Sequence, residues 1–170
     1  AQMNQCYHGF GRSWLGDLPG GMMFYLGCHL VDLVYQFMGE PDEVIPMNRS
    51  TGLEYENVTD FGLAMLKYPH GTSIIKSVAC EVSGDARRYL LISGTKGTIE
   101  IKPIESPFEL DGTVCPNKIS MTITRPGHPV MFADRPETVS FPPFGRYDAM
   151  MIDFAKTVAG EKPNEFDYEK

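Results

Sequence analysis

The sequence predicts an α+β domain built on an open, mostly antiparallel sheet with helices on one face. Three observations support this class: a long amphipathic helix pattern near the start, about seven strand-like runs after it, and a second helix pattern at the end. Runs of strands set between helices are typical of sheets that carry their helices on a single face. With 170 residues, 42% of them hydrophobic, the chain suits a single domain over residues 1–170.

The first helix is predicted from about Gly21 to Met38. Apolar side chains recur along it at helical spacing, and residues 39–41 (Gly-Glu-Pro) supply a stop signal, because glycine favours the C-cap and proline cannot continue a helix. A neighbouring stripe is mainly polar and consists of Tyr25, His29, Asp32 and Gln36. We expect the apolar stripe to pack on a sheet and the polar stripe to be able to face a cavity.

The strand-like runs are expected to pair as hairpins. A first strand is predicted from about Gln2 to Tyr7, and further strands at residues 43–47, 59–68, 73–79, 88–93, 98–101, 119–124 and 137–141. Turn residues at 69–72 and 94–97 predict two antiparallel hairpins. A helix from about Tyr147 to Val158 is expected to close the fold, with Met150, Met151, Phe154 and Ala155 facing inward.

Composition excludes several classes of partner. The net charge is −7 and the sequence has no run of Lys and Arg, so we expect no nucleic acid; no apolar stretch is long enough to span a bilayer. The four cysteines (Cys6, Cys28, Cys80 and Cys115) have no metal-binding spacing, which predicts no metal site and favours a reducing, cytoplasmic compartment. Because the chain starts without Met and in a strand-like run, we expect a fragment of a longer protein.

Several motifs follow one another in a distinctive order. A Gly20-Gly21 helix entry precedes Gly-x-His-x-x-Asp at residues 27–32, Gly-Glu-Pro at 39–41, a Gly-Thr-Lys-Gly hairpin at 94–97, and a closing helix followed by Gly-Glu-Lys-Pro at 160–163. This ordered set resembles the C-terminal domain of the glucose–fructose oxidoreductase, inositol dehydrogenase and MocA family. The resemblance implies the family's dihydrodipicolinate-reductase-like C-terminal fold.

The resemblance also implies an activity for the full-length protein. Members of this family move a hydride between NAD or NADP and a hydroxyl-bearing carbon of a sugar, inositol or related polyol. The Rossmann domain that binds the nucleotide is absent from this chain, because no Gly-x-Gly-x-x-Gly follows a strand. We therefore expect no cofactor bound to this chain, no activity from it alone, and a homo-oligomer formed through the bare sheet face.

The resemblance assigns roles to three residues of the polar stripe. His29 matches the acid–base histidine of the family, so it is the expected catalytic residue. Tyr25 stands where many relatives have an aspartate, and its phenol can still donate a hydrogen bond to a substrate hydroxyl. Asp32 is expected to bind a substrate hydroxyl or orient the imidazole, with a purely structural acceptor role as the alternative.

Four further residues are weaker candidates. Arg12 and Trp14 lie in the loop before the helix, where guanidinium groups can donate to hydroxyls and aromatic faces can stack on sugar rings; in the alternative, Trp14 only caps the core. Gly20 and Gly21 would leave N–H groups at the helix start near a cofactor, or form a simple loop-to-helix turn.

Two other functions stay open at this point. One is a non-catalytic assembly module with the same fold, which the replacement of aspartate by Tyr25 favours. The other is a relative that uses its nicotinamide transiently to cleave glycosides.

Overall fold

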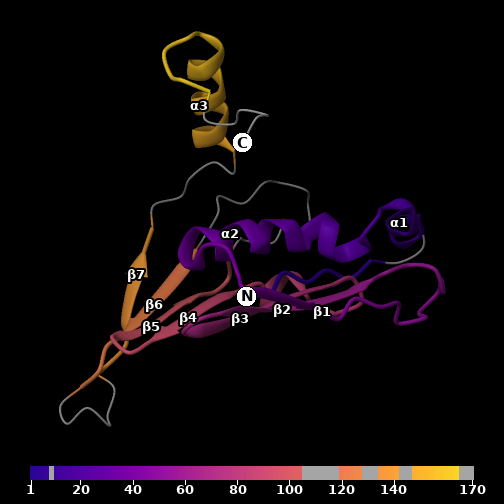
Figure 1. The fold of residues 1–170 in the computed structure, drawn as a ribbon, viewed down its shortest axis with the longest axis horizontal. Coiled ribbons are helices and arrows are strands. Elements are labelled where there is room, and N and C mark those ends of the chain that lie inside the picture. Colours follow the sequence, from indigo (N-terminus) through magenta and orange to yellow (C-terminus); the bar gives the residue numbers. More distant parts are fainter. Residues whose placement is uncertain (8–9, 105–118, 128–133, 142–146, 165–170) are drawn as a thin grey trace.

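A computed structural model describes residues 1–7, 10–104, 119–127, 134–141 and 147–164, and it shows a helix lying across a layer of β-sheet (Figure 1). Two antiparallel sheets make up this layer, with strand orders β1-β2-β3 and β4-β5-β6-β7. The predicted α+β class is therefore confirmed. No helix in the described part of the chain is long and apolar enough to cross a membrane.

The elements follow the predicted order. The strands are β1 Glu43–Pro46, β2 Phe61–Tyr68, β3 Gly71–Val78, β4 Leu90–Gly94, β5 Gly97–Ile101, β6 Ser120–Thr124 and β7 Glu137–Ser140. The α-helices are α1 Phe10–Ser13, α2 Cys28–Met38 and α3 Asp148–Val158, with 3-10 turns η1 Trp14–Asp17 and η3 Asp85–Arg87 and a π-helical turn η2 Met23–Gly27.

Both predicted hairpins are confirmed. Strands β2 and β3 pair from Phe61↔Val78 to Tyr68↔Gly71, and β4 and β5 meet at Gly94↔Gly97. Burial alternates along β2, as expected for a strand with one covered face. This register places Ala64, Leu66 and Ile75 under α2, where they pack against Leu30 and Val34 in the larger core cluster.

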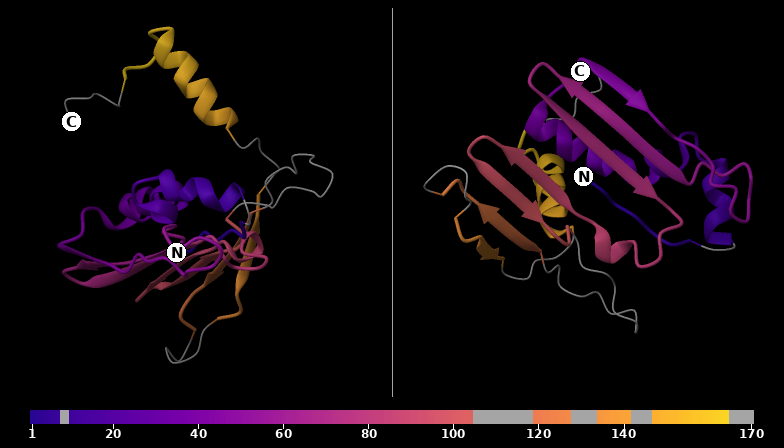
Figure 2. Two further views of the ribbon diagram at one scale, coloured as in Figure 1. Left: turned by 90° about the vertical axis from the view of Figure 1, so that its right-hand side faces the viewer. Right: turned by 90° about the horizontal axis from the view of Figure 1, so that it is seen from below.

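The predicted first strand is an extended segment, residues 1–7, that joins the two sheets. Gln2 exchanges both backbone hydrogen bonds with Tyr89, at 2.9 and 3.0 Å, just before β4. On its other side, the Met3 amide donates to the Lys76 carbonyl of β3 at 3.0 Å. The segment therefore runs between β3 and β4, and the right-hand view of Figure 2 shows it there between the two sheets.

The closing helix differs from the prediction in its packing. Its bounds agree with the sequence pattern, but no described side chain of α3 is buried, and Phe154 is 62% exposed. Figure 1 and the left view of Figure 2 show α3 on the same side of the sheets as α2 but standing apart from it. The expectation that Met150, Met151, Phe154 and Ala155 face inward was wrong. An amphipathic pattern predicts an apolar face on a helix, but it does not show which element packs against that face.

A buried ion pair fastens the loop before β2 to α1. Arg12 and Asp60 contact each other with side chains that are 0% and 1% exposed. The Arg12 Nε also donates to the Leu53 carbonyl at 2.8 Å, and the Thr51 amide donates to Asp60 Oδ1 at 2.8 Å. Because both charges are removed from water, each needs the other and these additional hydrogen bonds to remain buried.

This arrangement predicts a large stability loss when one charge is removed. Asp60→Asn should lower the free energy of unfolding by about 3–5 kcal/mol, because the guanidinium of Arg12 stays buried without its counterion. Urea denaturation followed by the fluorescence of Trp14, the only tryptophan, measures it. The matched control is Glu43→Gln in the exposed Lys67–Glu43 pair, which should cost about 1 kcal/mol or less. Equal losses of unfolding free energy in both variants would contradict the stabilising role given to the buried Arg12–Asp60 pair.

Candidate functional site

The candidate site is built around the start of the long helix. Gly20 and Gly21 have φ values of 84° and 52°, in the left-handed region that glycine adopts readily. Gly21 packs so closely on the backbone of Thr59 that a Cβ would collide with the Thr59 carbonyl, and the Met22 amide donates to this carbonyl at 2.8 Å. The helix therefore starts at a fixed point beside the beginning of β2.

The π-helical turn η2 lies between this start and α2. Such turns are rare, and they occur frequently at functional sites. Gly27 ends the turn and is buried, with the Met23 side chain folded across the place that a Cβ would take. The sequence predicts a helix here but has no signal for the wider turn. Tyr25 lies at the centre of η2 and is half-buried.

An aromatic cluster of Tyr7, Trp14 and Tyr25 flanks the helix. The Trp14 ring meets the Tyr25 ring edge to face, with centroids 4.8 Å apart, and the Tyr7 hydroxyl donates to the Tyr25 hydroxyl at 3.4 Å. The three residues come from the N-terminal segment, η1 and η2, so the fold brings them together from separate elements. Trp14 and Tyr25 are predicted site residues, and the structure places them in contact.

Tyr7 joins the site through its phenol. Partial burial, followed by its hydrogen bond to Tyr25, raises the pKa of Tyr7 to about 12 from an ordinary value of 10.0. Tyr7 is therefore a protonated donor at neutral pH. Because Tyr25 accepts this hydrogen bond, its own hydroxyl proton can be directed to another acceptor.

The polar stripe lies on the exposed side of α2. His29 follows Tyr25 by four residues, which is about one helical turn, and its side chain is exposed. Asp32 is also exposed and accepts a hydrogen bond from Gln36 Nε2 at 3.5 Å. Of the four residues of the predicted stripe, His29, Asp32 and Gln36 are thus exposed on α2, whereas Tyr25 is half-buried in η2.

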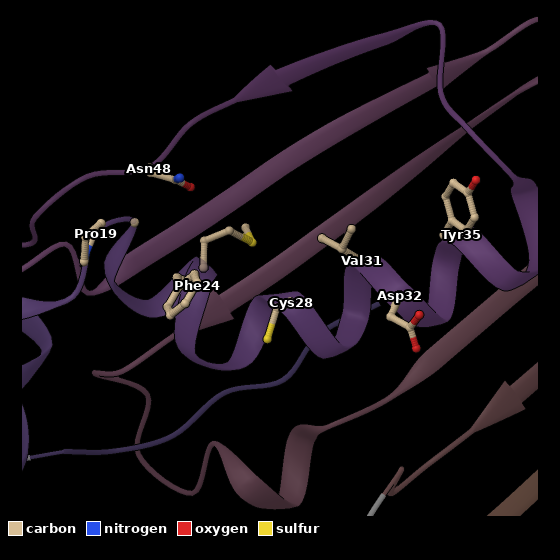
Figure 3. A pocket seen from close by; sticks show the side chains of 9 residues that line it. Pro19, Phe24, Cys28, Val31, Asp32, Tyr35 and Asn48 are labelled. Carbon is tan, nitrogen blue, oxygen red and sulfur yellow. The ribbon is translucent and has the colours of Figure 1, made fainter. Parts of the chain in front are cut away.

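A groove of about 580 Å³ follows another flank of the same helix (Figure 3). Its lining residues are Pro19, Gly20, Met23, Phe24, Cys28, Val31, Asp32, Tyr35 and Asn48. Asp32 lies at its edge, whereas His29, Tyr25 and Trp14 are not among these residues, so the structure does not bring all the predicted residues into this groove. The sequence carried a signal for the groove, because residues 24, 28, 31 and 35 recur at helical spacing.

The remaining candidates have structural partners. Arg12 is buried in the ion pair with Asp60, away from the exposed stripe. At the helix start, the Gly21 amide donates to the Leu18 carbonyl at 2.9 Å and the Met22 amide is bound to Thr59, so these groups do not fit a free cradle for a dinucleotide phosphate. Among the described residues, no group of three or more His, Cys, Asp or Glu side chains could hold a metal ion.

The sequence matches one protein-family model. Residues 2–100, more than half of the chain, match the model of the GFO/IDH/MocA C-terminal domain. A comparison with curated proteins gave no match.

Solved structures share this fold. YvaA of Bacillus subtilis, described as an oxidoreductase, superposes with a TM-score of 0.65 at 16% identity over 99% of this chain and 48% of its own. A protein named as an NADPH-dependent oxidoreductase from Desulfitobacterium hafniense gives 0.70 at 14% identity over 99% and 48%. An oxidoreductase from Bacillus cereus gives 0.63 at 16% identity over 99% and 58%. The chain thus spans about half the length of these relatives, and at such identity the likeness shows the fold alone.

The environment of Tyr7 predicts a pH effect on stability. Up to about pH 10 its phenol is protonated in the folded and unfolded states alike, whereas between about pH 10 and 12 the unfolded chain loses the proton first. Stability should therefore fall as pH rises through this window, and Tyr7→Phe should make the fall shallower. Urea denaturation at a series of pH values measures the slope. The control is Tyr55→Phe, at an exposed ring, which should keep the parental dependence of stability on pH. The same dependence in Tyr7→Phe as in the parent would disprove the role given to the Tyr7 phenol.

Proposed function

Because the chain belongs to the family of GFO/IDH/MocA C-terminal domains, we propose that it is the substrate-binding half of an oxidoreductase that moves a hydride between NAD or NADP and a hydroxyl of a sugar, inositol or related polyol. The observation that carries the proposal is the position of His29. It stands exposed on α2, one turn beyond Tyr25 and the aromatic cluster, with Asp32 one turn further on.

His29 is the proposed acid–base residue. An imidazole can take the proton from a hydroxyl as the hydride leaves the same carbon, and can return it in the reverse direction. The Tyr25 hydroxyl accepts from Tyr7, so its own proton can be donated to a second substrate oxygen. The exposed carboxylate of Asp32 can accept from a further hydroxyl. Three polar groups along one helix thus suit a ligand rich in hydroxyl groups.

The aromatic cluster supplies an apolar surface beside these polar groups. Sugar and cyclitol rings present C–H faces that pack on aromatic side chains, and the edge-to-face contact with Tyr25 holds the indole of Trp14 in place. Trp14 is half-buried, so part of its ring can meet a ligand. This combination of one apolar wall and nearby hydrogen-bonding groups is typical of small-molecule sites.

The nicotinamide cofactor would be held by the part of the protein outside this chain. The amides of Gly21 and Met22 are engaged within the fold, and the chain covers about half the length of its structural relatives. The role proposed for these residues is therefore to hold the substrate and move its hydroxyl proton.

The uncovered sheet face is the proposed surface for a homo-oligomer. Met65 and Ile74 are direct partners in the β2–β3 register, so they lie on one face, opposite the side covered by α2. They are 37% and 53% exposed, and Leu91 of β4 is 48% exposed. Apolar groups gathered on one face of a sheet are typical of a surface that pairs with another subunit.

Replacing His29 tests the proposed chemistry. In the polypeptide that joins this chain to its nucleotide-binding half, His29→Ala should lower turnover about 10²- to 10⁴-fold, the usual cost of losing a general acid or base. Fold and nucleotide affinity should be kept, because the side chain is exposed. The measurement is the absorbance change of NADH or NADPH with a panel of sugars, inositols and polyols.

Matched variants separate proton transfer from substrate binding. His70→Ala, at the exposed β2–β3 turn, should keep parental turnover. Asp32→Asn should have a smaller effect than His29→Ala, and Tyr25→Phe should mainly raise KM. If His29→Ala kept the parental turnover, we would conclude that another group transfers the proton. An inactive parent over the whole panel would favour the assembly-module alternative.

Light scattering tests the assembly. The parental chain should give a mass of at least a dimer, above the 19.0 kDa of one chain. Ile74→Glu should return it to a monomer, since a carboxylate in an apolar contact is costly to desolvate. The control is Val44→Glu, 53% exposed and paired with Leu66 on the α2 side of the sheet, which should leave the dimer intact. A parental monomer at the highest concentration reached would disprove this interface.

A further inference from the structure

Two cysteines lie directly opposite each other where the N-terminal segment passes the end of β3. Cys6 and Cys80 form an isolated antiparallel bridge, although they are far apart in the sequence. Both are thiols in the structure; Cys6 is exposed and Cys80 is half-buried. The sequence offered no signal for this pair, because it lacks the short spacings of paired cysteines.

The backbone hydrogen bonds fix the type of pairing. They flank the two cysteines: the Tyr7 amide donates to the Ala79 carbonyl at 2.9 Å, and the Glu81 amide donates to the Gln5 carbonyl at 3.1 Å. The two cysteines are therefore a non-hydrogen-bonded pair of an antiparallel ladder. In such pairs the Cα atoms are about 4.5 Å apart, the closest approach that a sheet offers, and both side chains point to the same side.

This backbone pairing is compatible with a disulfide. Disulfides join cysteines whose Cα atoms lie about 4.4–6.8 Å apart, with Cβ atoms facing each other. The register satisfies the Cα condition without a change in backbone pairing, and the exposure of Cys6 leaves its thiol within reach of a small reagent. The other described cysteine, Cys28, lies on α2 and lines the groove instead.

We propose that Cys6 and Cys80 form a reversible cross-strand disulfide in exchange with a small-molecule disulfide such as oxidised glutathione. The thiolate of one cysteine attacks a glutathione sulfur, breaks the glutathione S–S bond and releases one glutathione thiol. The second cysteine then attacks the protein-bound sulfur and releases the other glutathione. The two protein thiols are oxidised by two electrons, glutathione disulfide is reduced, and both protons end on the two glutathione thiols.

The bond would lock the segment that joins the two sheets. It closes a loop of roughly 75 residues, from Cys6 past α2 to the end of β3, and loops of this length give a large entropic stabilisation. It would also fix the backbone next to Tyr7, whose side chain belongs to the aromatic cluster. The proposal rests on the backbone register alone and is independent of the function proposed above.

The experiment uses the purified 170-residue chain, reduced and then equilibrated with oxidised and reduced glutathione at several ratios. The parent is compared with a Cys28→Ser/Cys115→Ser variant, in which only Cys6 and Cys80 remain. After remaining thiols are alkylated, intact mass and non-reducing peptide maps identify the bonds. Removing Cys80 as well, with Cys80→Ser, is the matched control for an isolated Cys6.

The expected product in parent and double variant is a Cys6–Cys80 cross-link, two hydrogens lighter than the reduced chain and free of glutathione. Its Tm should rise by about 5–10 °C on oxidation, whereas the Cys80→Ser control should carry only glutathione on Cys6 and gain no such rise. Glutathione adducts on both cysteines without a cross-link, or bonds from either to Cys28 or Cys115, would overturn the proposal. If the double variant fails to fold, the peptide map of the parent decides by itself.

Discussion

The backbone hydrogen bonds of residues 1–7 hold the two sheets in one layer. On one side the segment pairs with β3, through Met3 and Lys76, and on the other it exchanges both bonds of a pair between Gln2 and Tyr89. Without it, β3 and the chain entering β4 would each present unpaired N–H and C=O groups at a sheet edge. The β4–β7 sheet would then lose these backbone hydrogen bonds to the sheet on which α2 packs.

The candidate site depends on this segment because its parts follow directly along the chain. Tyr7 lies at the end of the segment, Arg12 follows in α1, and Trp14 begins η1. Arg12 is held by Asp60, so the short helical turns between the segment and α2 are anchored at the start of β2. Gly21 packs against the neighbouring Thr59. Trp14 and Tyr25 also pack on a buried apolar cluster that includes Leu15, so polar contacts and apolar packing together set where the two rings meet.

The sequence predicted the elements whose periodicity is local. Residues 21–38 show a helical stripe, and the two hairpins carry alternating strands with turn residues, so both were found. Pairs of residues far apart in the sequence leave no local pattern. The sequence around Arg12 predicts only a loop, and the fold brings Asp60 into contact with it. Likewise, only the backbone pairing of the folded chain shows that Cys6 lies opposite Cys80. The prediction that one face of α3 is buried was wrong for a related reason, because no described residues cover that face.

Within the site, the order of the polar groups along the helix could be predicted from the sequence, but their division between two flanks of the helix could not. Tyr25 belongs to the aromatic cluster and His29 is exposed on α2, whereas Asp32 lines the groove with Phe24 and Val31. A helix advances about 100° per residue, so a wide stripe on a helix projection can cover two separate surfaces, and the π-helical turn shifts the projection further.

Helix α2 therefore has three sides with different chemistry. The buried side holds the sheet through Leu30 and Val34, the polar side presents His29, and the groove presents mainly apolar side chains. Asp32 belongs to the polar stripe and also lines the groove, so these two surfaces adjoin along the helix. The apolar groups of the groove and of α3 are costly to leave in water, so both surfaces favour contact with another element or subunit.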